Sequence, residues 1–159
     1  MDCLLLQEDV DRLSVWCSKN RLCLNLTKCK VMTFHRSKNP HIFLYHINET
    51  LLDRVNKIKD LGVTFDHDLS FRVHIDRIVS KANSMLGFVK RSSYEFSKNL
   101  YVSLVRPVLE YCAIVWDPSF NLRIVRIERV QRNFIRFMIR KIGWTSTMPS
   151  YESRCELIG

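Results

Sequence analysis

Two spacings of hydrophobic residues divide this sequence. Up to about residue 68 short apolar runs alternate with polar residues, whereas from residue 69 apolar residues recur every three or four positions. The first spacing is typical of strands and the second of amphipathic helices. The chain itself opens at helical spacing, with Leu6, Val10, Leu13 and Cys17. These patterns predict an α+β protein, with an N-terminal helix and a small antiparallel sheet followed by a bundle of three to four helices.

The predicted sheet consists of strand-like segments at 22–34, at 42–47 and over about 51–65, which suggest three or four strands. Within the first segment, leucines alternate and a polar corner around Lys28 then interrupts them. Asn, Ser and Pro between the segments are typical turn residues.

Helical spacing predicts helices over about 75–89 and 100–112 and a last helix over about 121–142. Pro107 lies inside the second of these runs. Because proline lacks a backbone N–H and disfavours helix at the preceding residue, we expect a kink or break there. The sequence thus predicts a sheet-containing region at 1–68, a helical region at 69–142 and a tail at 143–159.

Composition narrows the class of protein. A chain of 159 residues with 47% hydrophobic content can build a core, and no apolar stretch approaches the roughly 20 residues of a membrane helix. The acidic N-terminal segment lacks the basic start of a signal peptide. We therefore expect an intracellular protein with reduced cysteines and no membrane partner.

Positive charge gathers on the predicted last helix. The chain has 25 Lys and Arg against 16 Asp and Glu, and Glu128 is the only acid between residues 121 and 142. A stripe about 120° wide at 100° per residue contains five arginines, with apolar residues mainly opposite: Arg126, Arg129, Arg132, Arg136 and Arg140. Arginine binds phosphate with two parallel hydrogen bonds, which favours nucleic acid. The alternative is a non-enzymatic basic helical module that binds an acidic protein partner.

Metal-binding and catalytic patterns are weak. Cysteine and histidine recur every six residues, a spacing unlike the tight pairs of structural zinc sites: Cys17, Cys23, Cys29, His35 and His41. Asp66 and Asp68 could hold magnesium, but aspartate is also common at such turns for backbone reasons. The sequence contains no nucleophile elbow, P-loop or glycine-rich phosphate cradle. We predict no metal site and no complete catalytic centre.

Several phrases, taken in order, resemble the downstream half of reverse transcriptases from jockey-like non-LTR retrotransposons. They are W-x3-N-x-L-x-LN-x2-K from Trp16 to Lys28, KDLGVTFD at 59–66, LSFRVHI at 69–75, LGFVKR at 86–91, LYVSLVRPVLEYCAIVWDP at 100–118 and IERVQRNFIR at 127–136. The resemblance covers about residues 10–140.

The resemblance implies roles for named residues. It places Lys28, with Lys30 nearby, in the palm segment called motif D, whose lysine is proposed to protonate the leaving pyrophosphate. It places Leu61, Gly62 and Val63 in motif E, the primer grip, and the later helices in a thumb-like region. RNA or an RNA–DNA duplex would then be the partner, bound in part by the arginine stripe.

One departure from the family limits this expectation. The family's polymerising centre needs an aspartate pair in an F/Y-x-DD turn upstream of motif D and another aspartate earlier, and these hold two magnesium ions. Nothing in this sequence matches them, since Asp9 and Asp11 lie in the predicted first helix. We therefore expect a fragment without cofactor or polymerase activity, which at most binds template–primer nucleic acid. Its missing partner would be an upstream portion of the polymerase.

Overall fold

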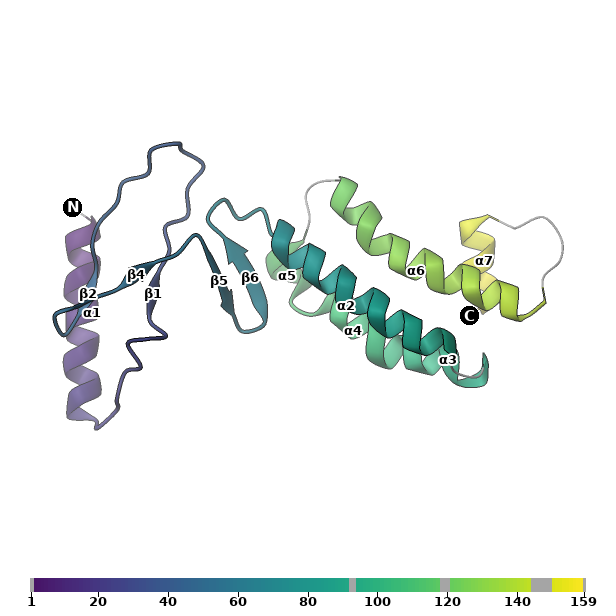
Figure 1. Ribbon diagram of the computed structural model, residues 1–159, viewed down its shortest axis with the longest axis horizontal. Helices are drawn as coiled ribbons and strands as arrows, with labels where there is room; N and C mark the ends of the chain where they lie inside the picture. Colours follow the sequence, from purple (N-terminus) through teal and green to yellow (C-terminus); the bar gives the residue numbers. More distant parts are fainter. Residues whose placement is uncertain (1, 92–93, 118–120, 144–149, 159) are drawn as a thin grey trace. The chain divides into compact units, whose positions relative to one another are not determined.

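The computed structural model describes residues 2–91, 94–117, 121–143 and 150–158. The chain divides into two compact units, Met1–Ser70 and Phe71–Gly159. An N-terminal helix and short strands precede several helices, which confirms the predicted α+β class (Figure 1). No helix in the described ranges is both long and apolar enough to cross a membrane.

The first unit contains helix α1 and six short strands. Their bounds are α1 Asp2–Lys19, β1 Lys30–Val31, β2 His46–Ile47, β3 Thr50–Leu51, β4 Asp53–Arg54, β5 Lys57–Asp60 and β6 Val63–Asp66. The strands pair as three two-stranded sheets rather than one: β1 with β4 in parallel, and β2–β3 and β5–β6 as antiparallel hairpins. The predicted strand at 22–34 shrinks to β1 because Lys28 N and Cys29 N both donate to Asn25 O, at 3.0 and 3.2 Å, and turn the chain.

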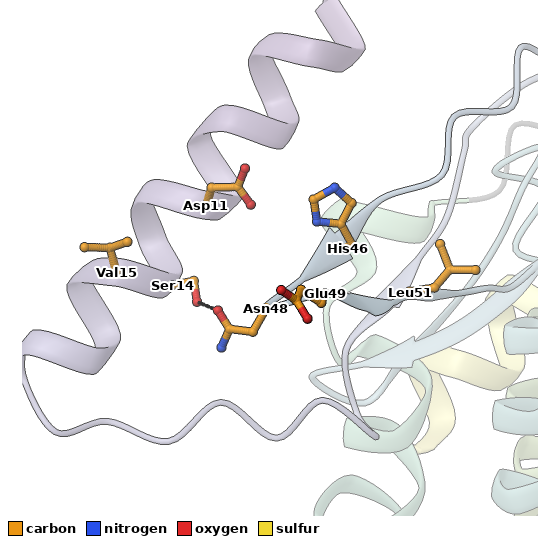
Figure 2. Close-up of a pocket in the computed structure, with 7 residues that line it drawn as sticks. All are labelled: Asp11, Ser14, Val15, His46, Asn48, Glu49 and Leu51. Carbon is orange, nitrogen blue, oxygen red and sulfur yellow. Dashed lines mark hydrogen bonds between the residues drawn. The ribbon is translucent and has the colours of Figure 1, made fainter.

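Polar contacts hold α1 to the β2–β3 hairpin. The buried Gln7 side chain donates to His46 O (2.9 Å) and accepts from His46 N (3.1 Å), as a neighbouring strand would. Ser14 Oγ donates to Asn48 Oδ1 at 2.6 Å, as Figure 2 shows. Of the four apolar residues at helical spacing, Cys17 is buried, whereas Leu6 and Leu13 are 51% and 52% exposed. The hydrogen bonds of Gln7 and Ser14, rather than these two leucines, therefore orient α1 against the hairpin.

The second unit is built from helices. Their bounds are α2 Arg72–Arg91, α3 Tyr94–Leu100, the π-helix η1 Tyr101–Val105, α4 Arg106–Glu110, α5 Ala113–Trp116, α6 Asn121–Lys141 and α7 Tyr151–Ile158. Helices α2 and α6 lie side by side (Figure 1) and bury aliphatic side chains that include Ile75, Ala82, Val130 and Ile139.

Near Pro107, where the sequence predicts a kink or break, the chain changes helix type without a break, because η1 runs directly into α4. The π-helix η1 ends where Arg106 N donates to Tyr101 O, five residues back. Pro107 then lies in the first turn of α4, where a missing N–H costs least. The wider π turn places Tyr101 against α6, where its ring stacks on Phe134 with centroids 4.1 Å apart.

Helix α7 lies within the predicted tail and contacts α6, which the sequence analysis did not anticipate. Residues 144–149 of that tail lie outside the described residues.

Candidate nucleic-acid interface

Helix α6 separates apolar from basic residues around its axis. Its buried residues are Val130, Phe134, Ile135, Met138 and Ile139. On the other side all five predicted arginines are exposed. The apolar residues fix the rotation of the helix, because turning it would expose them to water. The arginine side is therefore held outward by the core.

Two of the five arginines are engaged inside the second unit. Arg126 forms an ion pair with Asp76 of α2. Arg132 pairs with Glu128 one turn earlier at 2.7 Å, and its guanidinium lies 5.1 Å from the centre of the Tyr151 ring of α7. Both guanidinium groups already have an anionic neighbour, so they are less available to a phosphate than their exposure suggests.

The other three arginines form a row along α6. Arg129, Arg136 and Arg140 are exposed and have no ion pair or hydrogen bond to side chains in the described part of the chain. At 100° and 1.5 Å per residue they lie within about 40° of one another and span about 16 Å of the helix. We call these three residues the arginine row. It presents three guanidinium groups in line, an arrangement suited to binding successive phosphates of a nucleic-acid backbone.

Net charge is divided unequally between the two units. The second contains 15 Lys and Arg against 7 Asp and Glu, a net +8, whereas the first contains 10 against 9, a net +1. Almost all of the excess positive charge therefore lies in the unit that contains the arginine row. Such a field attracts a polyanion before contact.

The two lysines of the polar corner differ in their surroundings. Lys28 is exposed in the turn, and its ammonium has no hydrogen-bond or ion-pair partner among the described residues. Lys30 Nζ lies 2.7 Å from Asp53 Oδ2, directly across the parallel β1–β4 pair. This contact lowers the pKa of Asp53, first through the hydrogen bond and then through the charge of Lys30. Of the two, Lys28 is therefore the one whose ammonium can reach a ligand.

The stretch from Leu61 to Val63 forms the turn of the β5–β6 hairpin. Asp60 and Val63 are paired, so Leu61 and Gly62 are the two loop residues, with φ of 42° and 89°. Positive φ at both positions is typical of a type I′ turn, which usually contains Asn-Gly. Leu61 is 83% exposed at the tip whereas Val63 is buried. Only Leu61 and the backbone of this turn can therefore touch a ligand.

Asp66, the last residue of β6, and Asp68, two residues later, make contacts at the turn that follows this strand. Asp66 is buried and accepts a 2.5 Å hydrogen bond from Ser70 Oγ, and Asp68 Oδ1 accepts from Ser70 N at 3.2 Å. Among the described residues, no three His, Cys, Asp or Glu side chains are grouped as a metal ion requires. Both carboxylates thus accept hydrogen bonds from Ser70, which holds the turn after β6.

A hollow of about 450 Å³ lies between α1 and the β2–β3 hairpin. Figure 2 shows Asp11, His46 and Glu49 around it, together with the Ser14–Asn48 hydrogen bond. Two carboxylates at its wall would repel phosphate. The hollow is therefore unsuited to a nucleic-acid backbone.

Comparison with known proteins gives one relevant similarity. The chain is 28% identical, over 162 aligned positions, to the RNA-directed DNA polymerase from mobile element jockey of Drosophila funebris. The alignment covers 96% of the chain but 17% of that polymerase. No family model and no solved structure matches the chain.

The similarity supports a relation to the reverse transcriptases of mobile elements, the group that the ordered phrases resemble. The jockey polymerase is about six times as long as the aligned region, so its activity as a whole does not transfer directly to this chain.

Sequence reasoning identified the arginines but not their partners. The Glu128–Arg132 pair follows the i, i+4 rule and was open to prediction. Two other contacts join distant parts of the chain and cannot be predicted from a local pattern. They are the pairing of Arg126 with Asp76 and the contact of Arg132 with Tyr151.

Proposed function

We propose that this chain binds an RNA–DNA template–primer duplex through the arginine row of α6, as a downstream portion of an RNA-directed DNA polymerase. The observation that carries the proposal is the row itself: three exposed arginines aligned on a helix whose opposite side is buried, without acidic partners in the described part of the chain. The similarity to the jockey polymerase supplies the class of nucleic acid.

Three phosphate contacts set the size of the effect. Each neutralised phosphate contributes about −0.9 to the slope of log affinity against log salt, so the row contributes a slope of about −3. Raising salt from about 50 to 200 mM would then weaken binding by roughly 40-fold. A surface that only solvates its charges would show no saturable binding.

The test is fluorescence anisotropy with a labelled RNA–DNA hybrid at these two salt concentrations. Alanine at Arg129, Arg136 and Arg140 together is expected to abolish tight binding and to reduce the slope by about three. A control with alanine at Lys19, Arg21 and Lys57 makes the same change in net charge on exposed residues of the first unit. Equal losses in both variants would argue against the row as the site.

We further propose that the chain does not polymerise by itself. The 159 residues contain no F/Y-x-DD pair of the kind that holds catalytic magnesium in the resembled family. Purified chain incubated with primer–template, magnesium and nucleotides is expected to give no extended product. Extension that survives removal of contaminating polymerases would contradict this part of the proposal.

Lys28 and the Leu61–Gly62 turn belong to the proposal as secondary contacts. Lys28 and Leu61 are exposed in the first unit and Gly62 is half-buried, and the resemblance assigns them to motif D and the primer grip. The competing function, a basic module for an acidic protein partner, predicts that hybrid binding stays weak in low salt while an acidic polypeptide such as polyglutamate binds.

A further inference from the structure

A second hollow of the first unit is lined mainly by residues of the loop between β1 and β2, residues 32–45. Figure 1 shows the course of this loop. Its volume is about 410 Å³. Five rings line it: Phe34, His35, His41, Phe43 and Tyr45. Five of its eleven lining residues are therefore aromatic. A cavity of this size, walled by aromatic and a few polar groups, can hold a small planar ligand.

The loop is fastened across its base. Arg54 of β4 donates to Thr33 Oγ1 and, at 2.5 Å, to Phe43 O. The thiol of Cys3 in α1 lies 4.0 Å from His41 Nδ1, and the Phe43 and Tyr45 ring centres are 4.9 Å apart. These contacts position the walls in the free protein, so less ordering is needed when a ligand binds.

The charge around this hollow differs from that around the hollow between α1 and the β2–β3 hairpin. No Asp or Glu occurs among the side chains that line it. Arg36 and Lys38 lie on the same loop, exposed and without an acidic partner in the described ranges. Aromatic walls beside unpaired cations are the combination that single-stranded nucleic acids require, because every base has a flat face and every nucleotide a phosphate.

We propose that the aromatic hollow binds one unstacked base of a single-stranded RNA or DNA segment, with the adjoining phosphates at Arg36 and Lys38. Phe34 is the main stacking surface, because it lines the hollow and is 53% exposed. Ser37 and Asn39 bring polar groups to the same wall. The inference goes beyond duplex binding by α6, and it uses residues of the first unit alone.

Two fluorescein-labelled probes of equal charge separate base binding from phosphate binding. One is an octamer of thymidylate, and the other is an octamer of abasic deoxyribose phosphates. The thymidylate octamer is expected to bind the full chain at least about tenfold more tightly, since stacking on an aromatic side chain typically changes affinity by this factor or more. Equal affinity for the two probes would overturn the proposal and leave charge attraction alone.

Substitutions locate the site. Phe34→Ala is expected to weaken the thymidylate octamer about tenfold and to leave the abasic octamer unchanged. The matched control is Phe88→Ala on α2, because Phe88 is 52% exposed and lies outside the hollow. If Phe34→Ala behaves like the control, the hollow is not the site. Alanine at Arg36 and Lys38 should weaken both probes equally.

A last arm separates this inference from the proposed function. In the chain with alanine at Arg129, Arg136 and Arg140, hybrid binding is expected to fail while the preference for thymidylate over the abasic probe persists. Loss of that preference in this variant would move the base contact to α6 and overturn the assignment to the hollow. Hybrid binding that survives in it would contradict the duplex proposal alone.

Discussion

The guanidinium of Arg126 forms an ion pair with the carboxylate of Asp76, which joins α6 to α2. Arg126 belongs to the arginine stripe by helical angle, yet this neighbour neutralises it. Helical angle alone therefore overstates the basic surface of α6, and the arginines that remain without partners define the narrower row.

This difference predicts unequal effects of single arginine substitutions. Arg136→Ala removes one phosphate contact and should reduce the salt slope of hybrid binding by about one. Arg126→Ala should leave the slope nearly unchanged, and Asp76→Ala should increase it because Arg126 is then released. Anisotropy titrations over four salt concentrations measure all three slopes. Identical slopes for the two arginine variants would show that Arg126 contacts phosphate in spite of its ion pair with Asp76.

Burial of His74 predicts a pH-dependent stability. This side chain is 1% exposed in α2, and burial, aided by the nearby Arg77, lowers its pKa below the ordinary 6.5. Below that pH the unfolded chain takes up a proton that the folded state resists. His74 therefore does not reduce the free energy of unfolding above about pH 6.5. As the pH falls from there toward the lowered pKa, the free energy of unfolding decreases by at most about 1.4 kcal/mol per pH unit.

Urea unfolding at pH 7.5 and 5.5 measures this decline. His74→Phe keeps a ring near Trp116, whose ring centre lies 5.3 Å from that of His74, and removes the titrating group. The variant should lose less stability between the two pH values than the wild type. An equal loss in both chains would assign the pH dependence to other groups.

Stacking of Tyr101 on Phe134 predicts a large loss when the α6 ring is removed. The two rings are nearly parallel, with 8° between their planes, and Phe134 is 4% exposed. Phe134→Ala should reduce the free energy of unfolding by about 3–5 kcal/mol through lost burial and a cavity. Thermal denaturation followed by circular dichroism measures it. Phe137→Ala, on a half-buried ring of the same helix, is the control and should cost clearly less.

Helices were predicted more accurately than strands, for a physical reason. The predicted last helix at 121–142 agrees with α6 because its apolar residues follow one 3.6-residue repeat over five turns and need no distant partner to be recognised. Strands need partners. Leu22, Leu24 and Leu26 alternate as a strand should, yet the turn at Asn25 removes them from any sheet. The parallel β1–β4 pair depends on residues more than 20 positions apart.

The same limit applies to the candidate site. The exposure of all five stripe arginines follows from their helical angle, but which of them are engaged depends on Asp76 and Tyr151, which are distant in sequence. The aromatic hollow is assembled from α1, a loop and β4, so no single stretch of sequence contains it.

The hairpin tip predicts that stability and binding can be separated. Leu61 adopts a left-handed backbone conformation, which costs a leucine about 1 kcal/mol and an asparagine less. Leu61→Asn should therefore raise the free energy of unfolding by up to about 1 kcal/mol. If the turn contacts the duplex, the same variant should bind the hybrid more weakly. Urea unfolding and anisotropy on one preparation test both, and a less stable variant would contradict the turn assignment.

The hydrogen bonds of Gln7 predict that the stability of the chain depends on which groups of this side chain donate and which accept. Its amide accepts from His46 N and donates to both His46 O and Asp11 Oδ1, the latter at 2.8 Å. Gln7→Glu preserves shape and the acceptor but removes the donor and places a second carboxylate beside Asp11. A buried acceptor without a donor costs about 1–3 kcal/mol, and the like charges add to this. Urea unfolding at pH 7 should show a loss of at least that size.

The control for this change is Glu8→Gln, the reverse exchange on the next residue, whose side chain is 58% exposed. It should alter stability by less than about 0.5 kcal/mol. The deficit of Gln7→Glu relative to the wild type should also shrink as the pH approaches 4, because a protonated carboxyl regains a donor and loses its charge. A deficit independent of pH would mean that packing around Gln7, rather than its hydrogen-bond direction, holds α1 to the hairpin.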